Sequence, residues 1–268
     1  MRKNDPERVS YLKRLEFTYR THIDFEFPVT EHYFTLRCMP RPSAVQRLLA
    51  SELSLFPDVP WSLQRDGYGN LLQVGACRSP HSAFSFHASG RVAVDLSRRK
   101  PEPCHPSFGC PSPLTAGSPE LAAFLAKQLP ASGSPLDRAA ALMEAVHEHV
   151  TYTPGVTGVN TTAAQAFSMA RGVCQDESHI LISLCRIAGI PARYICGLTV
   201  GEGATHAWVE VWSEGCWYGL DPTRNKRVDE TYLVLAIGRD YYDCPVERGV
   251  LMGSGTQQQS VYMRVSEQ

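Results

Sequence analysis

The amino-acid sequence predicts an α+β fold, in which helices and strands occupy different parts of the chain. Three observations predict it. Short alternating apolar segments fill residues 1–100, and a Pro- and Ser-rich segment follows at 101–117. Residues 118–268 then begin with helical apolar spacing and end with alternating strands. We therefore predict a β-rich, sandwich-like N-terminal domain over 1–100, a linker over 101–117 and an α+β core over 118–268.

The predicted N-terminal domain begins with a long amphipathic strand. Between residues 15 and 27, apolar side chains alternate with polar ones, which is typical of a strand with one solvated face. Residues 33–39 form a second predicted strand, which Pro40 closes. Residues 45–56 are ambiguous, because their apolar spacing suits a helix in a region otherwise filled with strands.

Further short strands complete this domain. Residues 61–65 and 71–74 flank a glycine-bearing turn, so they are predicted to form a hairpin. Residues 83–87 and 91–96 alternate in the same way and add two strands.

The linker contains a group of residues that could bind a metal or form a disulfide, namely Cys104, His105 and Cys110. Three ligands without a fourth nearby are weak evidence for zinc, so a chance cluster in a loop is the preferred interpretation. The chain has nine cysteines, an odd number scattered through predicted strands and helices. This distribution favours reduced thiols over a disulfide framework.

Three helices are predicted before the strands of the core. Ser118 followed by Pro119 marks the start of the first, and Ser134 followed by a proline marks the start of the second, which runs to residue 150. A third, short helix over 162–171 leads into a turn at Gly172.

Cys174 follows this turn and precedes a helix whose apolar residues continue to Gly189. Unpaired N–H groups and the positive end of the helix dipole favour a thiolate at such a position. A buried, unreactive thiol is the commoner fate of cysteine, so position alone does not decide. Within the same helix, we expect Asp176 to cap the helix start and His179 to satisfy a buried hydrogen bond.

Two predicted strands downstream favour a reactive Cys174 over a buried, unreactive thiol. Residues 206–212 and 216–221 alternate and are separated by a tight connection, so they predict an antiparallel hairpin. With a turn around 213–214, His206 and Asp221 would lie opposite each other with Cβ atoms about 5 Å apart. A cysteine at a helix start, a histidine and an acid that orients the histidine form a complete nucleophilic set.

These residues resemble the microbial branch of the transglutaminase-like superfamily, which has the papain-like fold. The resemblance spans about residues 130–268 and rests on several separate motifs: Gly172-Val173-Cys174-Gln175-Asp176, Ala188-Gly189-Ile190-Pro191-Ala192-Arg193-Tyr194, His206-Ala-Trp-Val-Glu, Asp221-Pro222-Thr223, and the later Gly238-Arg239-Asp240-Tyr241 and Arg248-Gly249-Val250. It implies that Cys174, His206 and Asp221 are the catalytic triad. It also implies that 45–56 is a strand and that the β-rich domain is the one that precedes the core in this branch.

The triad predicts an enzyme that acts on amide bonds, in peptides or isopeptides, through a thioester. Hydrolysis and transfer to an amine both remain open, as do the substrate, the acyl acceptor and the oligomeric state. The backbone N–H of Cys174 is the expected first oxyanion donor. Tyr152 and Gln165 are candidates for the second, and Trp208 is either a substrate wall or aromatic core.

Two other functions are considered. A catalytically silent member of the fold would use the cleft to bind a peptide or scaffold a partner. A redox or metal role would use the cysteines and the histidine of the linker. No EF-hand-like acidic loop is visible, so we expect no metal and no cofactor.

Composition limits the partners. The net charge is −1 without a long basic run, which argues against nucleic acid or an anionic membrane surface. No apolar stretch is long enough to span a bilayer, and the charged N-terminus lacks the apolar centre of a signal peptide. A peptide or protein substrate in the cytoplasm is the resulting expectation.

Overall fold

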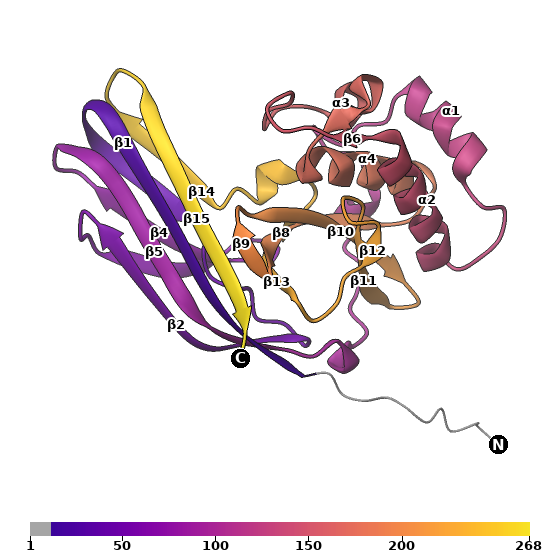
Figure 1. Ribbon diagram of the computed structural model, residues 1–268, viewed down its shortest axis with the longest axis horizontal. Coiled ribbons are helices and arrows are strands. Elements are labelled where there is room, and N and C mark those ends of the chain that lie inside the picture. Colours follow the sequence, from indigo (N-terminus) through magenta and orange to yellow (C-terminus); the bar gives the residue numbers. More distant parts are fainter. Residues whose placement is uncertain (1–11) are drawn as a thin grey trace.

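The computed structural model describes residues 12–268 and confirms the α+β class. Figure 1 shows a lobe of long strands beside a lobe in which helices lie over a second sheet. The strands of the first lobe are β1 (Lys13–Leu36), β2 (Gln46–Phe56), β3 (Trp61–Arg65), β4 (Leu71–Cys77), β5 (His81–Val94), β9 (Gly201–Gly203), β14 (Glu247–Met252) and β15 (Gln257–Glu267). The short turns of 3₁₀-helix are η1 (Leu96–Arg98), η2 (Pro106–Gly109) and η3 (Tyr241–Asp243).

The first sheet is built around β1. Its first half pairs with β5 and β15, and its second half pairs with β4 and β14. The two strands predicted over 15–27 and 33–39 are therefore one continuous strand. Irregular pairing and a positive φ of 48° at Glu31 mark the bend between its halves. Before the bend the buried side chains have odd residue numbers, and after it they have even ones.

Residues 46–56 form β2, so the helical interpretation of this segment is wrong and the strand implied by the family resemblance is right. The ladder between β2 and β5 shifts register between Leu48 and Ala50. The extra residue breaks the alternation of apolar side chains, so that the sequence imitates the spacing of a helix.

The last two strands do not belong to the second lobe. β14 and β15 lie within the stretch 118–268 that the sequence assigns to the core, yet both pair with β1. The chain thus completes the core and then returns to the first sheet (Figure 1).

The second sheet has the strand order β12-β11-β10-β8-β13. Its strands are β8 (Ala192–Thr199), β10 (His206–Ser213), β11 (Cys216–Asp221), β12 (Lys226–Arg227) and β13 (Tyr232–Gly238). One face packs against the helices α1 (Pro119–Gln128), α2 (Pro135–His149), α3 (Ala163–Met169) and α4 (Cys174–Ile187). A small parallel pair, β6 (Thr151–Tyr152) and β7 (Arg171–Gly172), joins the helices to the start of α4.

The predicted helix starts are confirmed. Ser118 and Ser134 cap α1 and α2 with a proline in the first turn, as their sequence pattern indicates. The segment 101–117 is fixed to the core by the buried Arg186, which donates to the carbonyl of Phe108 and to the hydroxyl of Thr115.

The two lobes are joined along β13, which is an edge strand of the second sheet. Side-chain amides from the first lobe occupy its free backbone groups. Gln46 accepts from the N–H of Val234 and donates to its carbonyl, both at 2.8 Å. Asn70 bonds both backbone groups of Ile237 in the same way, also at 2.8 Å. These amides substitute for a neighbouring strand and cover an edge that would otherwise be open.

Replacing Asn70 by alanine should therefore weaken the attachment of the lobes. The substitution leaves a buried N–H and a buried carbonyl unpaired, and we expect a loss of about 2–4 kcal/mol in unfolding free energy. Urea unfolding measures it as a lower midpoint. The control Gln64→Ala removes an exposed amide of β3 and should cost less than about 0.5 kcal/mol. Equal midpoints for the two variants would contradict the role given to Asn70.

Candidate active site

Cys174 is the first residue of α4, where its N–H has no acceptor within the helix. The preceding turn is closed by Asp176, whose carboxylate accepts from the N–H of Val173 at 2.8 Å and from the hydroxyl of Thr157 at 2.7 Å. The predicted capping role of Asp176 is confirmed. Gly172 is required beside it, because a Cβ there would lie 2.6 Å from that carboxylate.

His206 and Asp221 lie on the same face of the β10–β11 hairpin, but not opposite each other as predicted. Ser213 pairs with Cys216, so the turn is Glu214-Gly215, and both turn residues have positive φ, as a type I′ turn requires. The centre of the turn therefore lies one residue later than predicted, which shifts the pairing by two residues and keeps both side chains on one face. Asp221 takes the place opposite Trp208, and His206 is its diagonal neighbour.

The diagonal pair nevertheless makes a short hydrogen bond. His206 Nε2 lies 2.7 Å from Asp221 Oδ2, and Asp221 is completely buried. The thiol of Cys174 is the other group that favours the charged form of His206, since it also raises the pKa of the imidazole. Because Nε2 faces the carboxylate, Nδ1 is the ring nitrogen left for the sulfur.

The electrostatics of the pair favour charge on His206. Burial opposes the imidazolium, but hydrogen bonds and charge interactions with Asp221 and Cys174 outweigh it and raise the pKa of His206 to about 9. Burial would likewise raise the pKa of Asp221, yet the bond to His206 and further donors hold it below its ordinary value.

Several groups fix the Asp221 carboxylate. One oxygen accepts from the backbone N–H groups of Thr223 and Arg224, at 3.0 and 3.2 Å. The other oxygen accepts from the hydroxyl of Tyr232 at 2.7 Å, in addition to His206. Tyr232 and the turn after β11 are site residues that the sequence analysis missed, because neither contact follows from local spacing.

The three lesser candidates are placed differently. Tyr152 is half exposed and lies close enough to Cys174 for burial and the charge of the thiol to raise the pKa of its phenol. Gln165 forms the capping box of α3 with Thr162, which occupies its side-chain oxygen at 2.9 Å. Trp208 is fully buried behind His206, with its ring 5.2 Å from that of Tyr232. Trp208 is therefore core, and the substrate-wall interpretation is wrong.

Glu177 is a second missed residue and lies one helical turn after Cys174. It is 1% exposed and accepts a short hydrogen bond from the hydroxyl of Thr223, whose N–H donates to Asp221. Burial raises the pKa of Glu177 to about 7, with His147, Asp221 and His206 as the charged groups around it. The sequence offered no clear signal for Glu177, because it lies among the polar residues Asp176, Ser178 and His179.

The remaining polar candidates lie apart from this cluster. His179 is buried and its Nε2 accepts from the N–H of Tyr241 at 3.2 Å, as predicted for a structural histidine. His105 caps η2 in the linker. Within residues 12–268, no three His, Cys, Asp or Glu side chains are grouped so that they could hold a metal ion.

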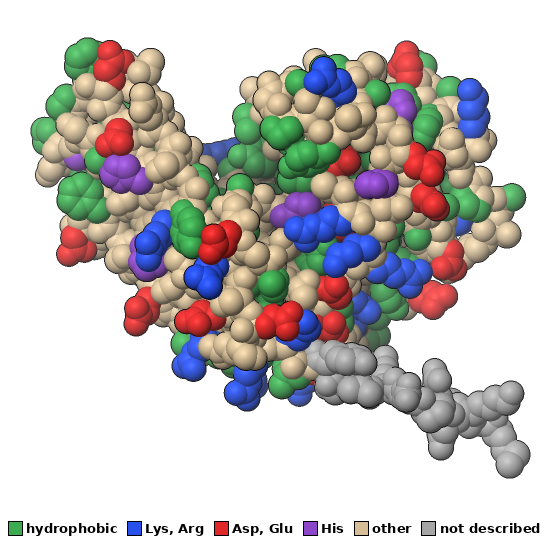
Figure 2. Space-filling model, viewed as in Figure 1, with side chains coloured by type: hydrophobic (Ala, Val, Ile, Leu, Met, Phe, Trp, Pro, Cys, Tyr) green, Lys and Arg blue, Asp and Glu red, His purple; other side chains and the backbone are tan. Residues whose placement is uncertain are grey.

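An open depression of about 880 Å³ lies beside the start of α4. Gln175, next to Cys174, donates to the carbonyl of Val159 in its wall at 3.4 Å. Its lining is mixed apolar and polar and includes Val156, Val159, Asn160, Ala164 and Met169. Figure 2 shows that the molecule is hollowed between its lobes, and that acidic and basic side chains are interspersed on this face.

A thiol at the start of a buried helix, facing a histidine on the adjacent sheet, is the arrangement of the papain-like class. Residues 123–222 match the transglutaminase-like superfamily, and residues 15–93 match the bacterial transglutaminase-like N-terminal region. The chain therefore belongs to the transglutaminase-like superfamily and carries the bacterial N-terminal region ahead of the core.

Similar proteins span most of the chain. An uncharacterised protein of Mycobacterium leprae is 25% identical over 94% of this chain and 98% of the relative. An uncharacterised protein of Mycobacterium tuberculosis is 28% identical over 89% of this chain and 87% of the relative. A protein-glutamine gamma-glutamyltransferase of Pseudomonas aeruginosa is 32% identical, but over only 40% of this chain and 18% of that enzyme.

The fold is also that of a solved structure. A crystal structure of a proposed cysteine protease from Cytophaga hutchinsonii superposes with a TM-score of 0.81 at 20% identity, and the match covers 96% of this chain and 91% of that one. Among residues 12–268, none of the helices combines the length and apolar character needed to cross a bilayer.

The position of Glu177 predicts a change in the titration of His206. Above its own pKa, Glu177 adds a negative charge beside the imidazolium, so Glu177→Gln should lower the pKa of His206 by on the order of half to one unit. NMR titration of the histidine ring carbons measures this shift. Glu144→Gln removes an exposed carboxylate of α2 and should leave the pKa unchanged. An unaltered His206 titration in Glu177→Gln would show that the two groups are not coupled.

Proposed function

We propose that the protein is a cysteine-nucleophile enzyme that cleaves or transfers acyl groups of peptide or isopeptide bonds, with Cys174, His206 and Asp221 as its triad. The observation that carries the proposal is the position of His206, which is hydrogen-bonded to the buried Asp221 and interacts electrostatically with the thiol of Cys174. This engagement favours an enzyme over the catalytically silent alternative, in which no such contact is needed.

The chemistry follows from these positions. The Cys174 thiolate attacks the amide carbonyl carbon, and a C–S bond forms as the carbonyl oxygen takes up negative charge. The imidazolium of His206 then gives its proton to the departing amine as the C–N bond breaks, which leaves a thioester. Water or an amine, deprotonated by His206, attacks the thioester and releases the thiol. Asp221 orients the ring and stabilises its charged form.

The oxyanion requires donors at the attacked carbonyl. The N–H of Cys174 supplies the first, since it lies in the first turn of α4 without an intrahelical acceptor. Tyr152 is the better of the two candidates for the second, because the charge of Cys174 raises the pKa of its phenol, whereas the side-chain oxygen of Gln165 is held by its capping box. The depression near the start of α4, which none of the triad residues lines, is the surface we propose for the part of a peptide chain beyond the scissile bond.

Thiol alkylation tests the nucleophile. Limiting iodoacetamide at neutral pH should label one cysteine much faster than the rest, and Cys174→Ala should abolish that labelling. His206→Gln should slow it by about tenfold or more, because the thiolate loses its ion-pair partner. Cys110→Ser removes an exposed thiol of the linker and should change nothing. Fast labelling that persists in Cys174→Ala would refute the assignment.

The fate of the thioester is tested with peptide substrates and a primary alkyl amine. Hydrolysis gives a product that has gained water, and transfer gives a product that has gained the amine, which mass spectrometry distinguishes. In Cys174→Ser, a slowly resolved ester on Ser would identify the acyl donor in a lysate. Turnover that survives Cys174→Ala would exclude the proposed mechanism.

A further inference from the structure

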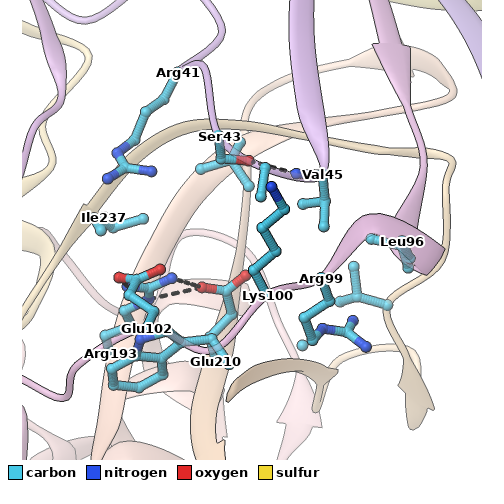
Figure 3. A pocket seen from close by; sticks show the side chains of 15 residues that line it. Arg41, Ser43, Val45, Leu96, Arg99, Lys100, Glu102, Arg193, Glu210 and Ile237 are labelled. Atoms are coloured by element: carbon cyan, nitrogen blue, oxygen red, sulfur yellow. Dashed lines mark hydrogen bonds and ion pairs between the residues drawn. The ribbon is translucent and has the colours of Figure 1, made fainter. Parts of the chain in front are cut away.

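A second cavity lies between the lobes, on the face of the second sheet that points away from the helices. Its volume is about 80 Å³. The walls come from the segment after β1, from the segment around η1, and from β8, β10 and β11 (Figure 3). Four of its side chains are cationic, namely Arg41, Arg99, Lys100 and Arg193, and only Glu102 and Glu210 are acidic.

Both carboxylates are already engaged by Arg193. Its guanidinium contacts Glu210 at 2.7 Å and Glu102 at 3.1 Å, and it lies over the ring of Trp217 with 4.1 Å to the centroid. The Arg193 side chain is 6% exposed, whereas Glu210 is largely buried and Glu102 is half exposed. These side chains form the floor of the cavity in Figure 3.

The other cations have no such partner. Within residues 12–268, no carboxylate lies within 4.0 Å of a charged nitrogen of Arg41, Arg99 or Lys100. Arg41 donates to the carbonyl of Tyr68 at 3.1 Å, while its Nε is buried without an acceptor. Arg99 stacks on Tyr218, with 4.4 Å to the ring centroid. Figure 3 shows Arg41 and Lys100 on either side of the space above the carboxylates.

This arrangement is electrostatically incomplete. Arg41 is partly buried, and burial together with the nearby Arg193 lowers its pKa, although Glu210 and Glu102 oppose this shift. Arg99 is partly exposed, and Lys100 is exposed at the mouth of the cavity. Guanidinium and ammonium groups that converge on a small space are the usual ligands of phosphate and carboxylate groups. The space accommodates on the order of five waters, which fits one phosphate or a short dicarboxylate and excludes a nucleotide.

We propose that this cavity, lined by Arg41, Arg99 and Lys100, is a binding site for a small multivalent oxyanion, separate from the cysteine site. An anion bound there would join Arg41, in the segment after β1, to Arg99 and Lys100, in the segment after β5. It would also lie on the same face of β10 as His206, since Glu210 and His206 are separated by an even number of residues along that strand.

Melting temperature provides the test on the full chain. Inorganic phosphate should raise it by about 5 °C at roughly a hundredfold excess over Kd, relative to sodium chloride at equal ionic strength. The same measurement with succinate shows whether the site prefers carboxylate or phosphate groups. Isothermal titration calorimetry with the same two salts gives the affinity directly.

Lys100→Gln and Arg41→Gln should each lower the phosphate affinity about tenfold. Arg91→Gln removes an exposed arginine of β5 and should retain the wild-type shift. If Arg41→Gln does not fold, Lys100→Gln decides alone, since its side chain makes no hydrogen bond within the described chain. A shift no larger than that of chloride, or a full shift in Lys100→Gln, would overturn the proposal.

Discussion

The hydrogen bond between His206 and Asp221 is the constraint on which the site depends. It joins adjacent strands diagonally, in the register that the Glu214-Gly215 turn sets. A slip of one residue would move Asp221 to the other face of the sheet. The carboxylate is also fully buried, and such a charge is tolerated only because Tyr232 and two backbone N–H groups share it with the imidazole. The register, the turn after β11 and β13 therefore all serve this one contact.

The start of α4 is held by a comparable set of buried polar groups. Asp176 ties the helix to the preceding turn, and Glu177 ties it to Thr223 and hence to Asp221. A helix packed on several sides gains most of its stability from apolar burial, and buried carboxylates reduce that gain. They fix instead the position of one helix end relative to the sheet, so that the sulfur and the imidazole meet. Preorganisation of this kind is a general requirement of catalytic groups.

The local features of the fold could be predicted from the sequence. The caps at Ser118 and Ser134, the cysteine at a helix start and the β10–β11 hairpin each depend on residues close together in the chain. The features that were missed depend on pairing between distant segments. The bulge in β2 altered an apolar period, and Tyr232 contacts Asp221 from another strand. The pairing of β10 with β11 is shifted by two residues from the prediction because the turn uses Gly215. Trp208 was ambiguous because the alternation of a strand shows that its ring lies on the same face as His206. It does not show whether another part of the chain covers that face.

The return of β14 and β15 to β1 has a consequence for how the polypeptide matures. Leu15 pairs with Glu267 and Phe25 with Gln257, so the first half of β1 pairs along one edge with β15. The ribosome synthesises β15 only after the whole core, and this edge of β1 therefore has no partner strand until then. During synthesis, this side presents unpaired backbone groups along a strand with an apolar face, the kind of surface to which holding chaperones bind. The N-terminal lobe is therefore translated first, but its sheet is completed last.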